Sequence, residues 1–345
     1  MNCLKRRSLL TLECTARTCL PTPRRVFSVL LLLLGSAVLW GNLAYAAYPD
    51  RPITLVLSFP AAGASDILAR AIGQKMSEAL GQPVVVENKP GAGGIIGLSY
   101  AAKSAADGYT LYLAAVSNLA IAAAAYTSQP VSLINDFVPV AGIATVPHML
   151  VVPASLPVQT VSQLITYLRA SPGKYNFASQ GAGTLSHLES ELFKNAAGLD
   201  LVHVPYKGSS QALPDLISGS STMMFDSIPA SMPHVKSGKL RVLAVASSKR
   251  MSLLPQVPTV DEGGLTGFEA NNVFGVAVPK GTSPAVLATL TKAIQIALSS
   301  PELIQRMQSQ GVDLKFTPAS EFSTTIAHEF ATWGKAVATA RVKLD

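Results

Sequence analysis

Apolar residues recur along the chain at two spacings, which predict alternating strands and helices. A continuous apolar run over 53–59 has the length of a buried strand, and a stripe at helical spacing from Ile67 to Leu80 follows it. Further strands are predicted at 84–87, 110–114, 176–178, 201–204, 222–225 and 240–246, and helices at 94–103, 161–168, 185–196, 211–217, 287–298 and 322–337. This alternation predicts an α/β fold with mixed, mostly parallel sheets and helices on both faces.

One uncharged, alanine-rich stretch between Asp107 and Asp136 could be mistaken for a membrane span. Polar residues and Pro130 interrupt it. We therefore predict a buried strand followed by a packed segment of small residues.

The chain is long enough for two domains. A first crossing between them is predicted at 148–152, between Pro147 and Pro153, and a return crossing within 247–278. We expect one domain at 47–148 plus about 250–345, and a second at about 149–249. Two α/β domains joined by two crossings form a hinged cleft that can close around a small ligand.

The first 46 residues are predicted to be an export signal. Arg24 and Arg25 precede an apolar run over 26–40, and positions 44–46 read Ala-Tyr-Ala, so cleavage is expected after Ala46. An uncleaved anchor is the alternative, but about 15 apolar residues are short for the roughly 20 that span a bilayer. The twin arginines partly fit the twin-arginine route, whereas the five leucines at 30–34 favour the general secretory route.

Charge and cysteine content exclude several classes of function. The chain carries a formal charge of +7, but its first 46 residues hold six basic residues and one acidic residue. The remaining 299 residues hold 21 basic and 19 acidic groups, a net of +2, which gives no large field for nucleic acid or an anionic membrane. All the cysteines (Cys3, Cys14 and Cys19) lie in the predicted signal. The mature chain therefore has no disulfide, Cys-ligated zinc, iron–sulfur cluster or thiol nucleophile.

Two loops of small residues each follow a predicted strand and lead into a helix. They span 59–66 and 179–184, and such loops lie at the carboxyl edge of a parallel sheet, where ligands bind. Helix N–H groups there can hold an anion, although each loop could equally be a capped turn and His187 a structural residue. The pair favours an anionic ligand held from both sides of a cleft. The candidate residues are Phe59, Ala62, Gly63, Ala64, Ser65, Asp66, Ser179, Gly181, Gly183, Thr184 and His187.

Other candidate residues follow further strands. Asp226 could bind a ligand hydroxyl or amine, order water, or cap the turn at Pro229. None of the candidate loops contains arginine, so amides, hydroxyls and waters would hold a carboxylate. These further candidates are Ser117, Asn118, Tyr206, Lys207, Gly208 and Asp226.

Enzyme motifs are not found in the sequence. The glycine-rich stretch 91–97 has isoleucine where a dinucleotide-binding motif needs its third glycine, which favours a tight turn under the next helix. The five histidines have no metal-ligand spacing. We therefore expect a protein that is not an enzyme and needs no cofactor or metal.

A series of short motifs occurs in a fixed order along the mature chain. They are YPDRPI at 48–53, FPAAGASD at 59–66, VVENKPGAGG at 85–94, DGYTL at 107–111, GAGT at 181–184, VPYKG at 204–208, MFD at 224–226, SGKLR at 237–241 and VPTV at 257–260. In these motifs the chain resembles the Bug family, the periplasmic solute-binding receptors of tripartite tricarboxylate transporters. The resemblance implies a two-domain periplasmic-binding (Venus flytrap) fold in a periplasmic protein, which we expect to be a monomer.

The resemblance also implies a ligand and a partner. The ligand would be a small di-, tri- or aromatic carboxylate or an amino acid, with one carboxylate held by 59–66, 179–184 and two ordered waters. The other candidate loops would contact the rest of the ligand and set the specificity. Membrane transporter subunits would receive the ligand. Two alternatives to a transport receptor remain: a protein that presents its ligand to a membrane sensor, or a secreted hydrolase. The sequence departs from the family at 61–62, 117–119 and 272–274. We expect the methyl group of Ala62, where the family usually has glycine, either to restrict the backbone or to narrow the pocket.

Overall fold

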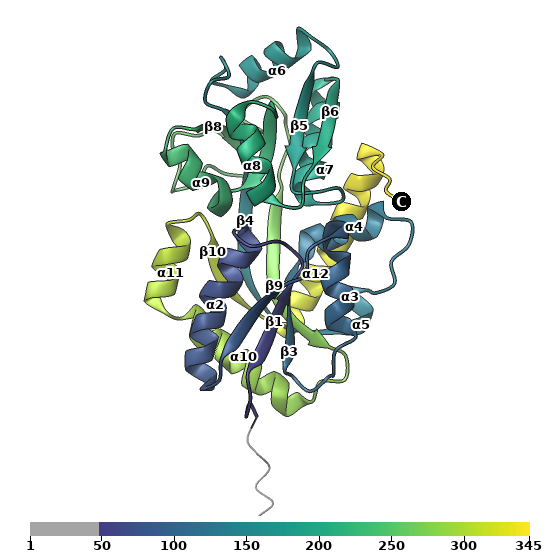
Figure 1. Cartoon of the computed structure of the whole chain (residues 1–345), viewed down its shortest axis with the longest axis vertical. Coiled ribbons are helices and arrows are strands. Elements are labelled where there is room, and N and C mark those ends of the chain that lie inside the picture. The colour runs from purple at the N-terminus through teal and green to yellow at the C-terminus, as the bar shows by residue number, and fades with distance from the viewer. Residues whose placement is uncertain (1–47) are drawn as a thin grey trace, which may run out of the picture. The chain divides into compact units, whose positions relative to one another are not determined.

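The computed structural model describes residues 48–345, which form one compact unit (Figure 1). The predicted signal, its cleavage site and the cysteines lie outside the described residues. The strands are β1 (Ile53–Leu57), β2 (Val84–Asn88), β3 (Thr110–Ala115), β4 (Phe137–Pro153), β5 (Tyr175–Ser179), β6 (Leu201–Pro205), β7 (Met223–Ser227), β8 (Leu240–Val245), β9 (Asn271–Pro279) and β10 (Asp313–Pro318).

The helices alternate with these strands over most of the chain, as predicted. They are α2 (Ala64–Leu80), the 3-10 turn η1 (Ala92–Gly94), α3 (Ile95–Ala102), α4 (Val116–Ala125), α5 (Leu133–Asp136), α6 (Val161–Arg169), α7 (Leu185–Ala197), α8 (Ser209–Ser218), α9 (Ile228–Lys236), α10 (Pro284–Leu298), α11 (Pro301–Gln308) and α12 (Ala319–Ala340). The α/β class is therefore confirmed. Every predicted helix and strand corresponds to an element within a few residues.

The strands pair in two groups that share β4. The first group has the order β2-β1-β3-β9-β4, with β10 also on β4, and the second has the order β4-β7-β5-β6, with β8 also on β4. The β1–β2, β1–β3, β5–β6 and β5–β7 pairs are parallel. All the pairs formed by β4 and β9 are antiparallel, so parallel pairing holds for the outer strands and not for most of the sheet.

The long strand β4 carries the chain from one group to the other. Its residues up to Pro147 pair with β9, and those from His148 pair with β7. The strand predicted at 148–152 is thus the second part of a longer strand, and the return strand β9 begins opposite Pro147 within the predicted window. Figure 1 shows β4 and β9 running side by side through the middle of the molecule.

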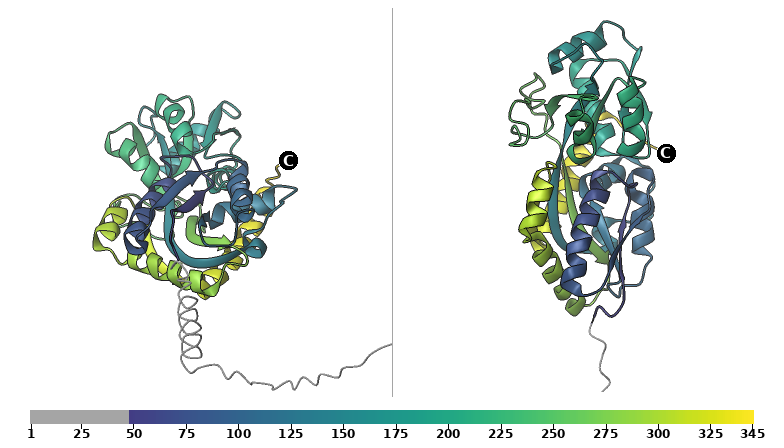
Figure 2. Two further views of the ribbon diagram at one scale, coloured as in Figure 1. Left: turned by 60° about the horizontal axis from the view of Figure 1, so that its bottom comes forward. Right: turned by 60° about the vertical axis from the view of Figure 1, so that its left-hand side comes forward.

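Helices cover both strand groups with apolar faces. Leu68, Ile72 and Met76 of α2 recur at helical spacing and are fully buried against β1 and β3. Each such side chain contributes about 1.5–3 kcal/mol relative to exposure. Helix α12 contributes to the cores of both groups: Phe322 packs against Gly142 of β4 and Gly275 of β9, and Trp333 belongs to the buried cluster that contains residues of β4 and β5. Figure 2 shows the helices and strands from two further sides.

Some elements were not predicted. Helix α9 was not predicted because it contains Pro229 and Pro233. Pro229 is in the first helical turn, where the N–H that proline lacks has no partner in any case, whereas Pro233 is inside the helix. The small residues after β3, predicted only as a packed segment, form helix α4. The short elements α5, α11 and β10 were also missed.

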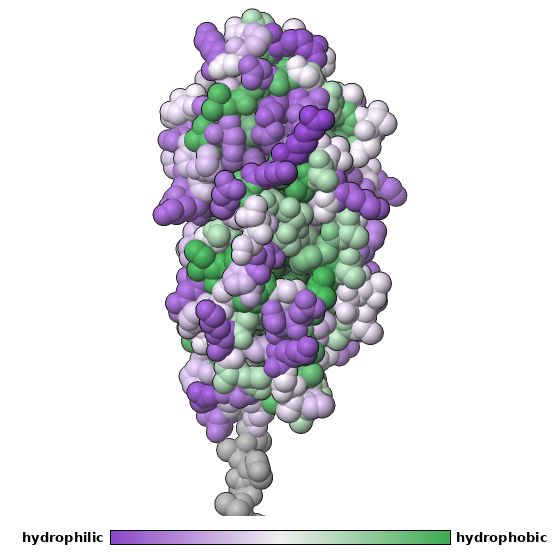
Figure 3. Space-filling view, turned by 90° about the vertical axis from the view of Figure 1, so that its right-hand side faces the viewer, coloured by the Kyte–Doolittle hydropathy of each residue, from purple (hydrophilic) through white to green (hydrophobic). Residues whose placement is uncertain are grey.

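The described surface is mixed in polarity. Large apolar side chains that are exposed, such as Ile96 and Tyr100 of α3, are few and scattered. On the face in Figure 3, apolar residues gather near the middle and polar residues surround them. Within residues 48–345, no helix combines the length and apolarity that crossing a bilayer requires.

Candidate ligand-binding site

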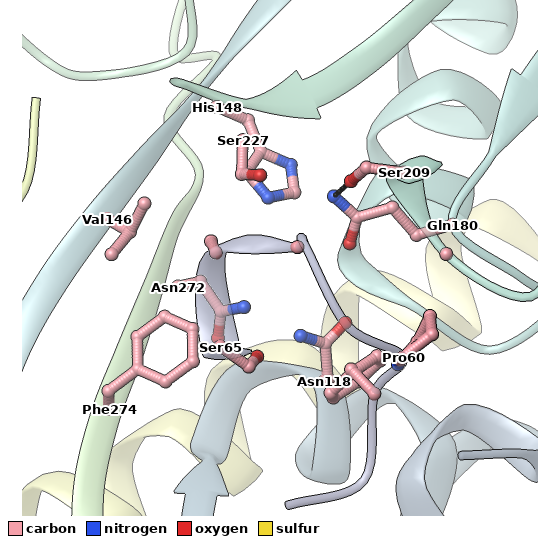
Figure 4. A pocket seen from close by; sticks show the side chains of 14 residues that line it. Pro60, Ser65, Asn118, Val146, His148, Gln180, Ser209, Ser227, Asn272 and Phe274 are labelled. Atoms are coloured by element: carbon pink, nitrogen blue, oxygen red, sulfur yellow. Dashed lines mark hydrogen bonds between the residues drawn. The ribbon is translucent and has the colours of Figure 1, made fainter. Parts of the chain in front are cut away.

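Two neighbouring cavities lie where loops from the two strand groups meet. They share Phe59, Pro60 and Gln180. The histidine cavity has a volume of about 20 Å³ and is further lined by Gly63, Ala64, Ser65, Asn118, Val146, His148, Gly208, Ser209, Ser227, Asn272 and Phe274 (Figure 4). The glycine cavity has a volume of about 400 Å³ and is further lined by Ser58, Pro90, Gly91, Ala92, Gly93, Gly94, Ile96, Tyr126, Gly181, Ala182, Thr184, Tyr206 and Lys207.

The N-terminus of α2 forms one wall of the histidine cavity. Its N-cap residue is Gly63, which has no side chain to accept a bond from the first turn. Ala64 and Ser65 of that turn line the cavity. Uncapped N–H groups at the start of a helix carry partial positive charge and bind anions.

Asp66 does not line either cavity but holds the loop before α2 in place. Its carboxylate accepts hydrogen bonds from the Ala62 N–H at 3.1 Å, from Asn88 at 3.0 Å and from two Arg70 nitrogens at 2.9 Å. Burial alone raises the pKa of Asp66, but these hydrogen bonds and the Arg70 charge outweigh it, so the pKa lies below its usual range. The bond to Ala62 also fixes that residue at a φ of 65°, in the left-handed region that a methyl group disfavours.

The N-terminus of α8 approaches the same cavity from the other strand group. Its N-cap is Gly208, again without a side-chain bond, and Ser209 lines the cavity. The chain adopts a φ of 125° at Gly208, and a Cβ there would lie 2.4 Å from Pro60 Cγ. The β1–α2 and β6–α8 loops therefore touch at a point that only glycine fits.

Two buried polar atoms of the histidine cavity have no hydrogen-bond partner among the described residues. They are Ser227 Oγ and Asn272 Oδ1, in residues whose exposed fractions are 2% and 4%. A buried polar group without a partner costs about 1–3 kcal/mol. Unpaired groups in a cavity between two uncapped helices are therefore suited to receive a polar ligand group.

Helix α7 behaves differently from α2 and α8. Thr184 caps it by accepting from the His187 N–H, and its Leu185 N–H donates to Asn118 Oδ1 at 2.8 Å. These first-turn donors are already bonded, so α7 cannot offer them to an anion. The sequence paired α2 with α7, whereas the structure pairs α2 with α8 in the histidine cavity and places the start of α7 beside the glycine cavity.

His187 is packed inside the protein and lines neither cavity. Its ring stacks on His203 with centroids 3.9 Å apart, and its Nδ1 accepts a hydrogen bond from Gly183 N–H. Burial lowers the pKa of both rings, that of His203 to about 3, with His187 contributing. Both rings are therefore neutral at physiological pH, which matches the structural alternative considered for His187.

Replacing Thr184 with alanine is expected to lower the free energy of unfolding by about 1 kcal/mol, because α7 loses its cap. Thr184 Oγ1 also donates to Gly181 O at 2.6 Å, so the wall of the glycine cavity should loosen and ligand affinity should fall. Urea unfolding and titration calorimetry measure the two effects. Thr184→Ser keeps both bonds and is the control; equal losses in the two variants would contradict this role.

Three further candidates, Asp226, Ser117 and Ser179, form hydrogen bonds inside the protein and do not line a cavity. Asp226 is fully buried and accepts hydrogen bonds from Gln180 at 2.7 Å, Ser209 at 2.6 Å and Ser231. It therefore connects the β5–α7 loop to α8 and α9 and does not line a cavity. Ser117 Oγ lies within hydrogen-bond distance of Asn271 O and Glu329, and ties α4 to β9 and α12. Ser179 Oγ accepts from Gly181 N–H and bonds to the His203 ring, which shapes its own loop.

Ten of the seventeen candidate residues predicted from the sequence line one or both cavities. Of these residues, the histidine cavity is lined by Phe59, Gly63, Ala64, Ser65, Asn118 and Gly208, and the glycine cavity by Phe59, Gly181, Thr184, Tyr206 and Lys207. Ala62, Asp66, Ser117, Ser179, Gly183, His187 and Asp226 line neither. Of the residues lining the glycine cavity within the described chain, Lys207 alone is charged, and its positive sign suits an anion.

Several lining residues were not found from the sequence. Gln180 lies between two candidates in one loop and could have been included by continuity. His148 lies inside β4, where its pairing changes from β9 to β7, and Ser227 and Asn272 lie at the ends of β7 and β9 that meet there. No local motif marks these three residues. The 91–94 turn packs tightly under α3, as predicted, and it also lines the glycine cavity.

The C-terminal tail lies beside the glycine cavity. Leu344 N–H donates to Ala125 O at 2.8 Å, and Leu344 Cδ1 lies 3.0 Å from where a Cβ on Gly183 would be. Tyr126 packs against the same glycine. The tail after α12 thus supports the loop at the start of α7.

The described part of the chain contains no group of three or more metal-ligating side chains (His, Cys, Asp or Glu) placed to hold a metal ion.

Comparison with known proteins gives a consistent match. Residues 68–341 match the family described as "Tripartite tricarboxylate transporter family receptor". The protein BugT of Bordetella pertussis is 36% identical over 321 residues, which cover 93% of this chain and 98% of BugT.

Solved structures with similar sequences have the same fold. The periplasmic binding protein BugD is similar with a TM-score of 0.82 and 32% identity, over 86% of this chain and 99% of BugD. The R. palustris protein Rpa4515 with adipate has a TM-score of 0.81 and 35% identity, over 86% of this chain and 99% of that one. MatC from Rhodopseudomonas palustris, with bound malate, has a TM-score of 0.79 and 29% identity, over 84% of this chain and all of MatC.

Proposed function

Because the chain belongs to the tripartite tricarboxylate transporter receptor family, a family of periplasmic solute-binding proteins, we propose that it captures a small carboxylate for uptake across the membrane. The ligand would bind at the two cavities between the strand groups, and membrane transporter subunits would receive it. On this proposal the chain is exported to the periplasm, and residues 47–148 with about 250–345 act as one domain against about 149–249.

The observation that carries the proposal is the histidine cavity. Two helices from different strand groups, α2 and α8, each present an uncapped N-terminus to it. An anion between them would interact favourably with both helix dipoles. The cavity has room for about one water-sized group, so it would take only the end of a ligand. The larger glycine cavity, with Lys207 on its wall, would take the rest.

The related structures support this ligand class. Rpa4515 was solved with adipate and MatC with malate, and both ligands are small dicarboxylates. Neither protein is identical enough to this chain to fix which carboxylate fits here. We therefore propose the class and not a particular member.

A thermal-shift panel of mono-, di- and tricarboxylates tests the proposal. A ligand at about one hundred times its Kd that binds only the native state stabilises it by about 2.7 kcal/mol. We expect at least one carboxylate to raise the Tm by several degrees. A neutral sugar and an organic cation serve as controls, and a Tm rise with either of them but with no carboxylate would refute the proposal.

A further inference from the structure

A buried histidine–carboxylate pair lies at the histidine cavity, outside all the loops that the sequence indicated. His148 is on β4 and lines the cavity, and its Nδ1 lies 2.6 Å from Glu189 Oε2 of α7. The exposed fractions of the two side chains are 1% and 0%. Figure 4 shows the imidazole at the edge of the cavity, near Ser227 and facing Ser65 and Asn118 across it.

The pair leaves one ring nitrogen directed at the cavity. Because Glu189 occupies Nδ1, it orients the ring and places a proton there. The other nitrogen, Nε2, forms no hydrogen bond with any residue from 48 to 345. Removing two charged groups from water is costly, and packing alone would be served as well by apolar residues. A buried pair with one free donor at a cavity is therefore suited to binding.

The charges around His148 favour a protonated ring. Glu189 from α7 and Asp226 from β7 are the acidic groups that act on it. Burial lowers the pKa of His148, but the Glu189 charge, its hydrogen bond and the Asp226 charge outweigh this, so the pKa lies above the ordinary value. No other residue that lines the cavity has a charged side chain. The polar ones are Ser65, Asn118, Gln180, Ser209, Ser227 and Asn272, and the rest are apolar or glycine.

We propose that His148, positioned by Glu189, contacts the ligand directly and donates a hydrogen bond from Nε2 to the carboxylate that enters the histidine cavity. This inference rests on the proposed function. It identifies a cation for the histidine cavity, whose lining contains no lysine or arginine. The carboxylate would lie between the N–H groups of α2 and α8 and the imidazolium. Binding would then favour the protonated ring and become weaker as the pH rises through its pKa.

The test uses titration calorimetry of the full mature chain with adipate, malate and succinate between about pH 6 and about pH 9, where these probes are ionised. For each probe that binds, we expect affinity to fall as the pH rises. His148→Asn keeps a donor near the Nδ1 position but nothing at Nε2. It should bind about ten- to one hundredfold more weakly at the lower pH, with little pH dependence left.

Glu189→Gln provides a matched control for the positioning role. The amide still accepts from Nδ1 but carries no charge, so the pKa of His148 should fall. Binding should be close to that of the wild type at the lowest pH and be lost at a lower pH than in the wild type. A purely structural role for Glu189 would instead weaken binding equally at every pH.

Nitrogen NMR of the His148 ring keeps the proposal testable even if a variant fails to fold. A bound probe should raise the pKa of His148 in the wild-type protein. An unchanged pKa in the complex, affinity that rises with pH, or wild-type binding by His148→Asn would each overturn the proposal while leaving carboxylate capture intact. If no carboxylate binds the wild type at any pH, the proposed function itself fails.

Discussion

Replacing Gly208 with alanine is expected to weaken ligand binding by about ten- to one hundredfold. A Cβ at this position would lie 2.4 Å from Pro60 Cγ and 2.9 Å from Pro60 Cδ. The two residues belong to loops of different strand groups, so, if the proposed domains close on the ligand, the clash would arise only in the closed arrangement. The variant should therefore spend less time in the binding-competent arrangement, and the apparent Kd should rise by the same factor. Titration calorimetry with the best carboxylate of the panel measures this rise.

Gly208→Ala also strains the backbone, and a control variant is needed to separate this effect from the clash with Pro60. The φ of 125° at Gly208 is unfavourable for alanine whether the cleft is open or closed, at a cost on the order of 1–3 kcal/mol. Gly219→Ala, at the other end of α8, also has a positive φ of 84° but has no atom within 4 Å of the added Cβ. This control should lose stability and keep its affinity. Pro60→Ala should restore much of the binding of Gly208→Ala; equal affinity losses in the two glycine variants would show that the contact does not matter.

Replacing Asp66 with alanine is expected to lower the free energy of unfolding by about 2–3 kcal/mol. The Ala62 N–H and the Asn88 amide, whose hydrogen bonds to Asp66 are partly buried, would each lose a charged acceptor, and Arg70 would lose its partner. The Arg70 contribution is small because its side chain is 54% exposed and screened by water. Ligand affinity should fall as well, because the loop that lines the histidine cavity loses its support. Urea unfolding at neutral pH measures the loss of stability.

The pH dependence of Asp66 gives a second measurement. The pKa of Asp66 is depressed in the folded protein, so its contribution is present above its unfolded pKa of about 3.9 and is lost as the pH falls through the folded pKa. Asp66→Asn keeps an acceptor for the Ala62 N–H but removes the charge. The stability difference between wild type and Asp66→Asn should shrink in acid, and a constant difference down to about pH 3 would contradict this account.

The elements that the sequence predicted share strong periodicity. The stripe from Ile67 to Leu80 and the run at 53–59 correspond to α2 and β1, because burial on one face leaves a regular apolar pattern. Helix α9 was missed because Pro229 and Pro233 read as a turn. The antiparallel pairing of β4 and β9 was missed because strand direction depends on how distant segments meet, which local pattern does not record.

The candidate site was predicted only in part, because the sequence shows local patterns and not contacts between distant segments. Loops after strands carry local signals in small residues, so Gly63 and Gly208 were found. The pair of His148 and Glu189 is separated by 41 positions and has no motif. Asp66 and Asp226 were chosen because they follow predicted strands, yet hydrogen bonds inside the protein already occupy their oxygens. Sequence shows which groups can bind a ligand but not which are already paired.

The position of the C-terminus affects how these measurements should be made. Leu344 bonds to Ala125 and contacts the region of Gly183, so the chain ends next to the loop that opens α7. A purification tag fused after Asp345 would begin one residue beyond Leu344, which pairs with Tyr126 of the glycine-cavity wall. Histidine-rich tags also titrate between about pH 6 and about pH 7 and would add their own proton uptake to the calorimetry. Protein for these experiments should therefore be prepared with a C-terminal tag that is removed before binding is measured.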